Sequence, residues 1–247
     1  MDNAWHIHFG AQSLLIDPWL EGVEVDYFGW FNTQWHRTPP LDYASVPHAD
    51  AVLITQKYPD HCHPPTLRRL RPRQIIAPAS LQQRLAKLLP KATVHALDAD
   101  TPVVQFGDVS IRHLPTRRRI DPMYDAFVLD DGATSVFLAP HGFDLDEQHL
   151  TALKGMSPCS LVMGPFNRYR LPALLGGIVA PGLDSLRRLC ETLQPKHIAR
   201  THDEDKHASG FVHRLARVER FDKGALEEHP WLADRWLQLS DYTPVVL

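Results

Sequence analysis

Between an apolar run and a helix-like segment, the chain reads Thr55-Gln56-Lys57-Tyr58-Pro59-Asp60-His61-Cys62-His63. The apolar run, residues 51–54, predicts a buried strand. Residues 64–70, which begin with two prolines, predict a helix. The polar stretch therefore lies at the end of a strand.

The chain on either side of this stretch predicts an α/β fold. Apolar alternation and turn residues separate short strands, and longer periodic segments predict helices, with Ser80 as the N-cap of the second helix. The predicted strands are 4–9, 13–16, 51–54, 74–77, 93–97, 103–106, 109–114, 125–129, 135–138, 161–163, 197–199 and 242–247. The predicted helices are 64–70, 80–89, 145–153, 184–193 and 211–219. Two β-rich halves covered by helices predict a four-layer αββα sandwich.

Residues 19–40 are rich in aromatic side chains and have no clean period of 2 or 3.6. We interpret them as a long loop, and long loops in compact domains are often functional. Its aromatic part, residues 27–35, favours core cover or an oligomer contact, with a substrate wall as the alternative.

The quoted stretch resembles the T-H-x-H-x-D-H motif of the metallo-β-lactamase superfamily, with Gln56 and Tyr58 at the places of the first two histidines. Residues 15–20, Leu-Ile-Asp-Pro-Trp-Leu, resemble the first motif of that superfamily. They are closest to the branch that holds ascorbate-phosphate lactonases and N-acyl-phosphatidylethanolamine phospholipase D. Residues 195–204 resemble the last motif, which contains a ligand histidine, here His202. The resemblance implies the αββα fold and a dinuclear metal site.

On this resemblance, the first of the two metal sites has lost its ligands. Gln56 offers only a neutral amide oxygen, and Tyr58 would bind only as a phenolate, whose ordinary pKa is ~10. A third histidine is expected near residues 114–119, where Arg117 and Arg118 stand, and a guanidinium cannot deprotonate to bind a metal.

The second site keeps Asp60, His61 and His202, a set that suits one zinc, iron or manganese with an open position. The bridging aspartate is replaced by Pro140, and His141 follows one residue later. Because a shift of one residue at a strand end turns a side chain to the other face, His141 is left open as a fourth ligand. The absence of any metal also stays open.

The resemblance assigns roles around this site. Asp60, Arg118 and Tyr58 are the candidate catalytic residues, and a guanidinium fork suits a phosphate or carboxylate. The candidate pocket residues are Gln56, Tyr58, Arg117, Asp17 and Trp19, of which Asp17 orients the metal-binding loop.

Several of these residues and their neighbours also have a purely structural interpretation. Asp60 would cap the helix at 64–70, where a carboxylate stabilises the first turn. Cys62 lacks an identifiable base and is interpreted as a buried thiol. His63, His113 and His207 are interpreted as surface or satisfied core groups, and residues 117–119 as a solvated basic run.

Composition sets the remaining limits. A chain of 247 residues without a compositional break predicts one domain, 1–247. A net charge of −3 argues against nucleic acid as a partner, and no apolar run is long enough for a membrane span. The three scattered cysteines favour the cytoplasm. The expected partner is a small-molecule substrate, anionic if the arginines face it, and a homo-oligomer is left open.

The leading hypothesis is a hydrolase of an ester, lactone or phosphodiester with at most one metal. The main alternative is a metal-free pseudoenzyme that binds a small anion or a protein without turnover, which Gln56, Tyr58 and Arg118 favour. Nucleic-acid processing is a third hypothesis, which the acidic net charge and the short arginine run disfavour.

Overall fold

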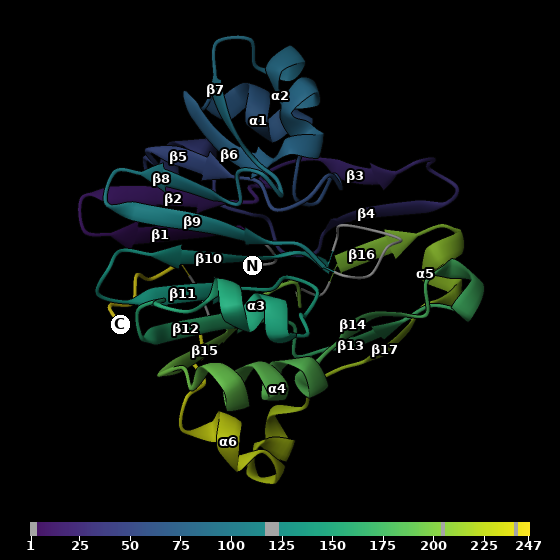
Figure 1. Cartoon of the computed structure of the whole chain (residues 1–247). Helices are drawn as coiled ribbons and strands as arrows, with labels where there is room; N and C mark the ends of the chain where they lie inside the picture. The colour runs from purple at the N-terminus through teal and green to yellow at the C-terminus, as the bar shows by residue number, and fades with distance from the viewer. Residues whose placement is uncertain (1–3, 117–123, 204–205, 240–241) are drawn as a thin grey trace. The chain divides into compact units, whose positions relative to one another are not determined.

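The computed structural model describes residues 4–116, 124–203, 206–239 and 242–247 (Figure 1). The chain divides into two compact units. Unit 1 comprises Leu114–Asp203 and Ala216–Leu247, and unit 2 comprises Asp2–His113 and Glu204–Leu215. Strands and helices occur in both, so the α/β prediction is confirmed.

The main sheet of unit 2 has the strand order β1-β2-β5-β6-β7. Its strands are β1 (Trp5–Phe9), β2 (Gln12–Ile16), β5 (Ala51–Leu53), β6 (Gln74–Pro78) and β7 (Thr93–Leu97). The first pair is antiparallel, and the pairs from β2 to β7 are parallel. The carboxyl ends of β2 and β5 therefore lie at the same edge of the sheet.

Helices α1 (Pro64–Leu70) and α2 (Gln82–Leu88) cover one face of this sheet. Leu67 of α1 and Leu85 of α2 are completely buried and belong to one core cluster with Val52 and Ile75 of the sheet. This packing fixes the stretch between β5 and α1 at both of its ends. The antiparallel pair β8 (Val103–Phe106) and β9 (Val109–Leu114) follows β7.

A smaller antiparallel sheet in unit 2 has the order β16-β4-β3. It consists of β3 (Val23–Asp26), β4 (Asn32–His36) and β16 (Lys206–Ser209), and α5 (Phe211–Leu215) follows β16. The prediction of a long loop over 19–40 is therefore wrong over β3 and β4. The alternation of Val-Glu-Val-Asp is a strand signal, but the valines face solvent and Glu24 is buried, which inverts the usual pattern.

The main sheet of unit 1 runs in the order β15-β12-β11-β10. Its strands are β10 (Ala126–Asp130), β11 (Ser135–Leu138), β12 (Cys159–Gly164) and β15 (His197–Arg200). Only the β10–β11 pair is antiparallel among these described pairs. Helix α4 (Leu183–Leu193) buries Leu186 and Leu189 in a core cluster with Val162 of β12.

The remaining elements of unit 1 are helices α3 (Glu147–Ala152) and α6 (Pro230–Ala233) and a small sheet. That sheet has the order β14-β13-β17 and consists of β13 (Arg168–Arg170), β14 (Ile178–Pro181) and β17 (Arg217–Glu219). Single-turn 3₁₀ helices span Tyr43–Ser45, Ala79–Leu81 and Ala173–Leu175, and a longer one spans Lys223–Glu228.

Several predicted boundaries are wrong. The helix predicted over 211–219 ends at Leu215, and β17 follows it. Ser80 lies inside the 3₁₀ turn, so that Leu81 precedes α2 in place of a side-chain cap. Residues 242–247 form no strand.

Candidate functional site

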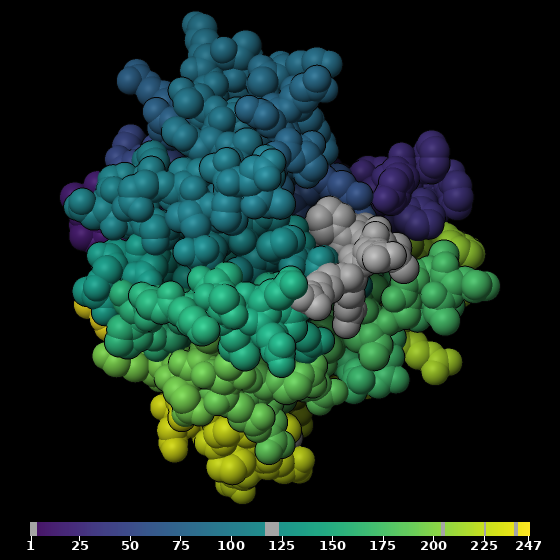
Figure 2. Space-filling view, viewed as in Figure 1, coloured from purple at the N-terminus to yellow at the C-terminus, as the bar shows by residue number. Residues whose placement is uncertain are grey.

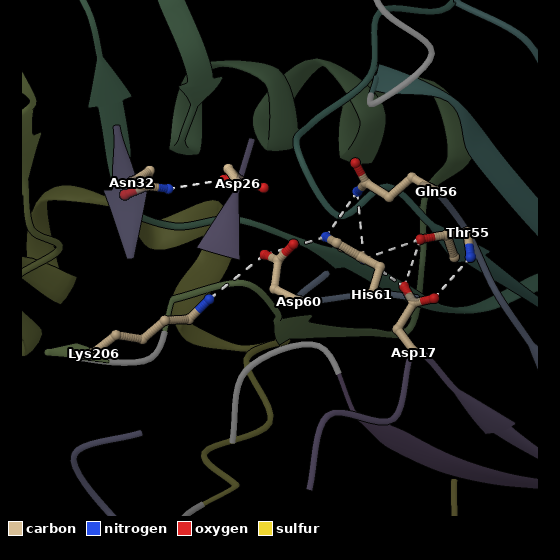
Figure 3. Close-up of polar contacts among 8 residues, drawn as sticks. All are labelled: Asp17, Asp26, Asn32, Thr55, Gln56, Asp60, His61 and Lys206. Carbon is tan, nitrogen blue, oxygen red and sulfur yellow. Dashed lines mark hydrogen bonds and ion pairs between the residues drawn. The ribbon is translucent and has the colours of Figure 1, made fainter. Parts of the chain in front are cut away.

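His61 is the centre of a buried polar cluster in unit 2 (Figure 3). Its Nδ1 atom lies 2.7 Å from Oδ2 of Asp17, which is itself only 1 % exposed. Because an ionised carboxylate only accepts hydrogen bonds, Nδ1 carries the proton and donates it. A ring that carries only this one proton has its lone pair on Nε2, the nitrogen that can bind a metal.

The parallel pairing of β2 and β5 brings Asp17 to His61. Asp17 directly follows β2, and Ile16 lies opposite Leu53 at the end of β5. Asp17 accepts hydrogen bonds from the backbone nitrogen and the hydroxyl of Thr55, and its own nitrogen donates to Leu53 O at 3.0 Å. Its φ of 42° lies in the left-handed region, where non-glycine residues are uncommon. The hydrogen bonds hold this strained residue in place.

Gln56 contacts the other face of the His61 ring. Its Nε2 atom lies 2.9 Å from His61 Nε2, and its side chain is buried. The same amide nitrogen lies 3.4 Å from Nδ1. Because it is close to both ring nitrogens, the amide lies over the ring and leaves the in-plane lone pair of Nε2 open.

Asp60 lies between His61 and a lysine. Its Oδ2 atom is 3.6 Å from His61 Nε2 and 3.6 Å from Nζ of Lys206. The side chains of Lys206 and Asp60 are 7 % and 11 % exposed. The ammonium also lies 5.1 Å from the ring centre of Trp19, which is almost completely buried. A cation and an aromatic face thus surround this carboxylate.

Asp26 and Asn32 lie across from each other at the ends of β3 and β4, beside Asp60 (Figure 3). Asn32 donates a hydrogen bond of 2.8 Å to Asp26. Burial, with the negative charge of Asp60 in second place, raises the pKa of the Asp26 carboxyl from 3.8 to about 6.

Tyr58 contributes its backbone to this cluster. Its carbonyl accepts hydrogen bonds from the nitrogens of His61 and Cys62, at 3.0 and 2.7 Å, which form the turn that presents Asp60 and His61. Its ring lies 5.1 Å from Nζ of Lys57.

The residues interpreted as structural occupy different positions in unit 2. His63 rather than Asp60 is the N-cap of α1, because Nδ1 of His63 accepts from Thr66 N, so the capping interpretation of Asp60 is wrong. Cys62 is completely buried, and burial raises the pKa of its thiol to about 11, as expected for an unreactive cysteine. His113 is buried, and exposed His207 stacks on Trp35 with ring centres 5.6 Å apart.

In unit 1, the rings of His141 and His202 lie together, with centres 4.2 Å apart. His141 lies in a turn rather than in β11, so the alternation of side chains along a strand does not determine which way it points. β11 ends at Leu138, and a turn closed by Gly142 N and Ala139 O at 2.9 Å carries His141. His202 has a φ of 62°, in the left-handed region. Such strained residues are often found at functional sites.

The residue after His202 fixes this corner of unit 1. Asp203 accepts hydrogen bonds from the backbone nitrogens of Phe166 and Asn167, at 2.6 and 3.0 Å. Burial raises the pKa of its carboxyl to about 6.

A hollow of about 230 Å³ in unit 1 reaches His141. Tyr124 lies at its wall, with its ring centre 6.2 Å from that of His141. The other lining residues are Thr116, Gly142, Phe143, Asp144, Pro181 and Ser185. Arg117 and Arg118 lie outside the described residues, so their roles stay predictions.

The β3–β4 hairpin of unit 2 carries an exposed aromatic tip, at the right of Figure 2 in purple. We define this tip by Tyr27, Phe28 and Trp30, whose exposed fractions are 68, 61 and 67 %. The interpretation of this segment as core cover is therefore wrong for these residues.

Sequence reasoning missed Lys206, Asp26, Asn32 and the role of Thr55. Lys206 lies in β16, which pairs with β4, and β4 was interpreted as a loop. The Val-Glu-Val-Asp alternation would have identified β3, but nothing local to residue 206 indicates its partner Asp60.

The sequence profile described as the Beta-lactamase superfamily domain matches residues 12–202. None of the curated proteins matches the chain. Among solved structures, isothiocyanate hydrolase from Delia radicum gut bacteria is 17% identical with a TM-score of 0.64, over 96% of this chain and 92% of that one. The metallo-beta-lactamase fold protein YhfI from Bacillus subtilis is 14% identical with a TM-score of 0.59, over 96% and 87%.

A possible metal-dependent hydrolase from Veillonella parvula is 15% identical with a TM-score of 0.60, over 81% of each chain. At these identities the likeness is one of fold alone. The predicted metallo-β-lactamase fold is confirmed.

Proposed function

Because the chain belongs to the β-lactamase superfamily, we propose that it is a hydrolase of an ester, lactone or phosphodiester with at most one bound metal. The proposed ligands are Asp60, His61 and His202, with His141 as the fourth candidate. The observation that carries the proposal is the hydrogen bond of 2.7 Å between Asp17 and His61, which orients the Nε2 lone pair for a metal.

The described residues fit one metal better than two. His61 and Asp60 supply an imidazole and a carboxylate, and the paired rings of His141 and His202 supply further nitrogen donors. Gln56 and Tyr58, in contrast, provide no anionic or imidazole ligand for a first site. When bound, a divalent zinc, iron or manganese acts as a Lewis acid on a carbonyl or phosphoryl oxygen.

The protein's own side chains orient the ligands and shape the substrate site. Asp17 holds the His61 ring in place through the hydrogen bond between them. The side chains of Trp19 and Gln56 line the buried side of the cluster. The hollow beside His141 and Tyr124, of about 230 Å³, is smaller than the roughly 300–1,000 Å³ of ordinary ligand pockets, and we assign it to one small group of the substrate. We assign Arg117 and Arg118 to an anionic group of the substrate and keep Asp60, Arg118 and Tyr58 as the catalytic candidates.

The remaining parts of the proposal concern partners and location. We propose one domain over 1–247, a small-molecule substrate and no nucleic acid, since the net charge is −3. Three buried free cysteines support the cytoplasm. The exposed aromatic tip supports a homo-oligomer. None of the helices within the described ranges has the length and hydrophobicity that a bilayer span requires.

Turnover tests the proposal. A generic phosphodiester, a lactone and a thioester are each incubated with protein purified without chelators, and bound metal is measured on the same sample. We expect hydrolysis of at least one substrate, and loss of both hydrolysis and metal in Asp60→Ala. Asp50→Asn, an exposed carboxylate of the same unit, is the control. Equal turnover by wild type and Asp60→Ala would contradict the proposal.

One observation favours a metal-free binding protein as the second candidate. Gln56 and Lys206 already contact His61 and Asp60, so the cluster is stable without a metal. This candidate predicts no turnover and no bound metal, but stabilisation by a small anion such as phosphate in thermal unfolding.

A further inference from the structure

Two side chains of unit 2 already contact the ligand atoms that the proposed function assigns to a metal (Figure 3). Gln56 Nε2 lies 2.9 Å from His61 Nε2, and Lys206 Nζ lies 3.6 Å from Asp60 Oδ2. Both contacts are buried or nearly so. A metal at these ligands would have to weaken the contact between Lys206 and Asp60.

The amide of Gln56 does not compete for an electron pair. Its nitrogen lies 2.9 Å from Nε2 and 3.4 Å from Nδ1 of His61, so it lies over the ring and the lone pair of Nε2 stays open. The competing contact is therefore the one between Lys206 and Asp60.

The ammonium of Lys206 competes by charge. At 3.6 Å it neutralises the Asp60 carboxylate, and its 7 % exposure keeps water from screening it fully. A divalent cation placed on Asp60 would be repelled by this neighbour. The stem of Lys206 cannot easily withdraw, because β16 is paired with β4 and the ammonium lies over Trp19.

We propose that Lys206 is an internal competitor for the metal and lowers the metal affinity of the site. The inference rests on the proposed ligands Asp60 and His61. It assigns a role in metal binding to Lys206, which lies beyond the residues matched by the superfamily profile. The wild-type protein then binds zinc weakly, and removal of the Lys206 ammonium strengthens binding.

Zinc affinity, measured by competition with a chromophoric chelator, tests this role. Lys206→Met keeps the length of the stem over Trp19 and removes the charge, and we expect zinc affinity to rise roughly tenfold or more. Lys57→Met is the matched control, because Lys57 is an exposed lysine in the segment that contains Asp60 and His61. The zinc affinity of this variant should equal that of wild type.

A second pair of variants separates this inference from the proposed function. If Asp60→Ala abolishes zinc binding but Lys206→Met leaves it unchanged, the ligands stand and the competitor role is wrong. If wild type binds no zinc, and Lys206→Met binds it only while Asp60 is present, the competitor role is supported. If Lys206→Met also binds none, the role is overturned. Circular dichroism and thermal unfolding establish that each variant is folded, and Lys206→Gln replaces Lys206→Met if the latter is not.

Discussion

At the scale of single residues, Asp17 determines which nitrogen of the His61 ring carries the lone pair. The carboxylate fixes the ring tautomer, and Thr55 holds the carboxylate with two hydrogen bonds. The sequence alone placed Asp17 at a strand end and the resemblance gave it an orienting role. The hydrogen bond to His61 supplies the physical basis for that role.

Asp17→Asn tests this orientation. Asparagine tolerates the left-handed backbone at this position, so the fold should persist, but it no longer offers a carboxylate to the ring. We expect zinc affinity to fall about 10- to 100-fold. The affinity is measured by chelator competition, with Asp50→Asn as the control. An unchanged affinity in the folded variant would show that Asp17 does not orient the ligand.

Asp26 makes the stability of unit 2 depend on pH. Its pKa is raised from 3.8 to about 6, so between these values the unfolded chain releases the proton while the folded chain keeps it. This carboxyl therefore lowers the free energy of unfolding as the pH rises through that window.

We expect Asp26→Asn to be more stable than wild type at pH 7.5, by up to about 3 kcal/mol, because one pKa unit corresponds to ~1.4 kcal/mol. The difference should nearly vanish at pH 4. Urea unfolding at both pH values measures it. A difference that is the same at both would mean that the Asp26 carboxyl is not the cause.

At the scale of elements, the helices and strands that pack on apolar cores were predictable and the small sheet of unit 2 was not. Residues 51–54 and 64–70 follow ordinary hydrophobic periodicity, and β5 and α1 lie where they were expected. β3 also shows the alternation of a strand, but it lies in a segment that as a whole has no clean period, and its valines rather than Glu24 point outward. The local sequence pattern therefore did not reveal the sheet β16-β4-β3, which positions Lys206.

Gly210 joins β16 to α5 beside the backbone of Trp30 and Phe31, which directly precede β4. Its φ is +105°, and an added Cβ would lie 2.7 Å from Phe31 O and 3.0 Å from Trp30 O. Hydrogen bonds from Phe211 N to Trp30 O and from Val212 N to Phe31 O, both 2.9 Å, prevent the two segments from separating. A side chain therefore has no room here.

Gly210→Ala should lower the free energy of unfolding by about 2 kcal/mol or more, from backbone strain and the clash together. Gly155→Ala is the control, since Gly155 also has positive φ but nothing within 4 Å of its Cβ position. Chemical denaturation compares the two. Equal losses in both variants would mean that close contact at Gly210 contributes nothing.

At the scale of the whole molecule, the sequence was sufficient to identify the superfamily and the proposed ligands, but not Lys206. The superfamily profile covers residues 12–202, which include Asp17, Asp60, His61 and His202. Lys206 follows that range, and its contact with Asp60 arises from the pairing of β16 with β4, far apart in the chain. A contact of this kind depends on tertiary structure, so residue spacing could not reveal it.

We propose that one metal is bound by Asp60, His61 and His202. A crystal of the chain grown with zinc and measured at the zinc absorption edge provides the decisive test. We predict one anomalous peak within bonding distance of an Asp60 oxygen and of ring nitrogens of His61 and His202, and no peak there in Asp60→Ala crystals. A zinc-soaked crystal with no peak at these residues, or a peak that persists in Asp60→Ala, would contradict the claim.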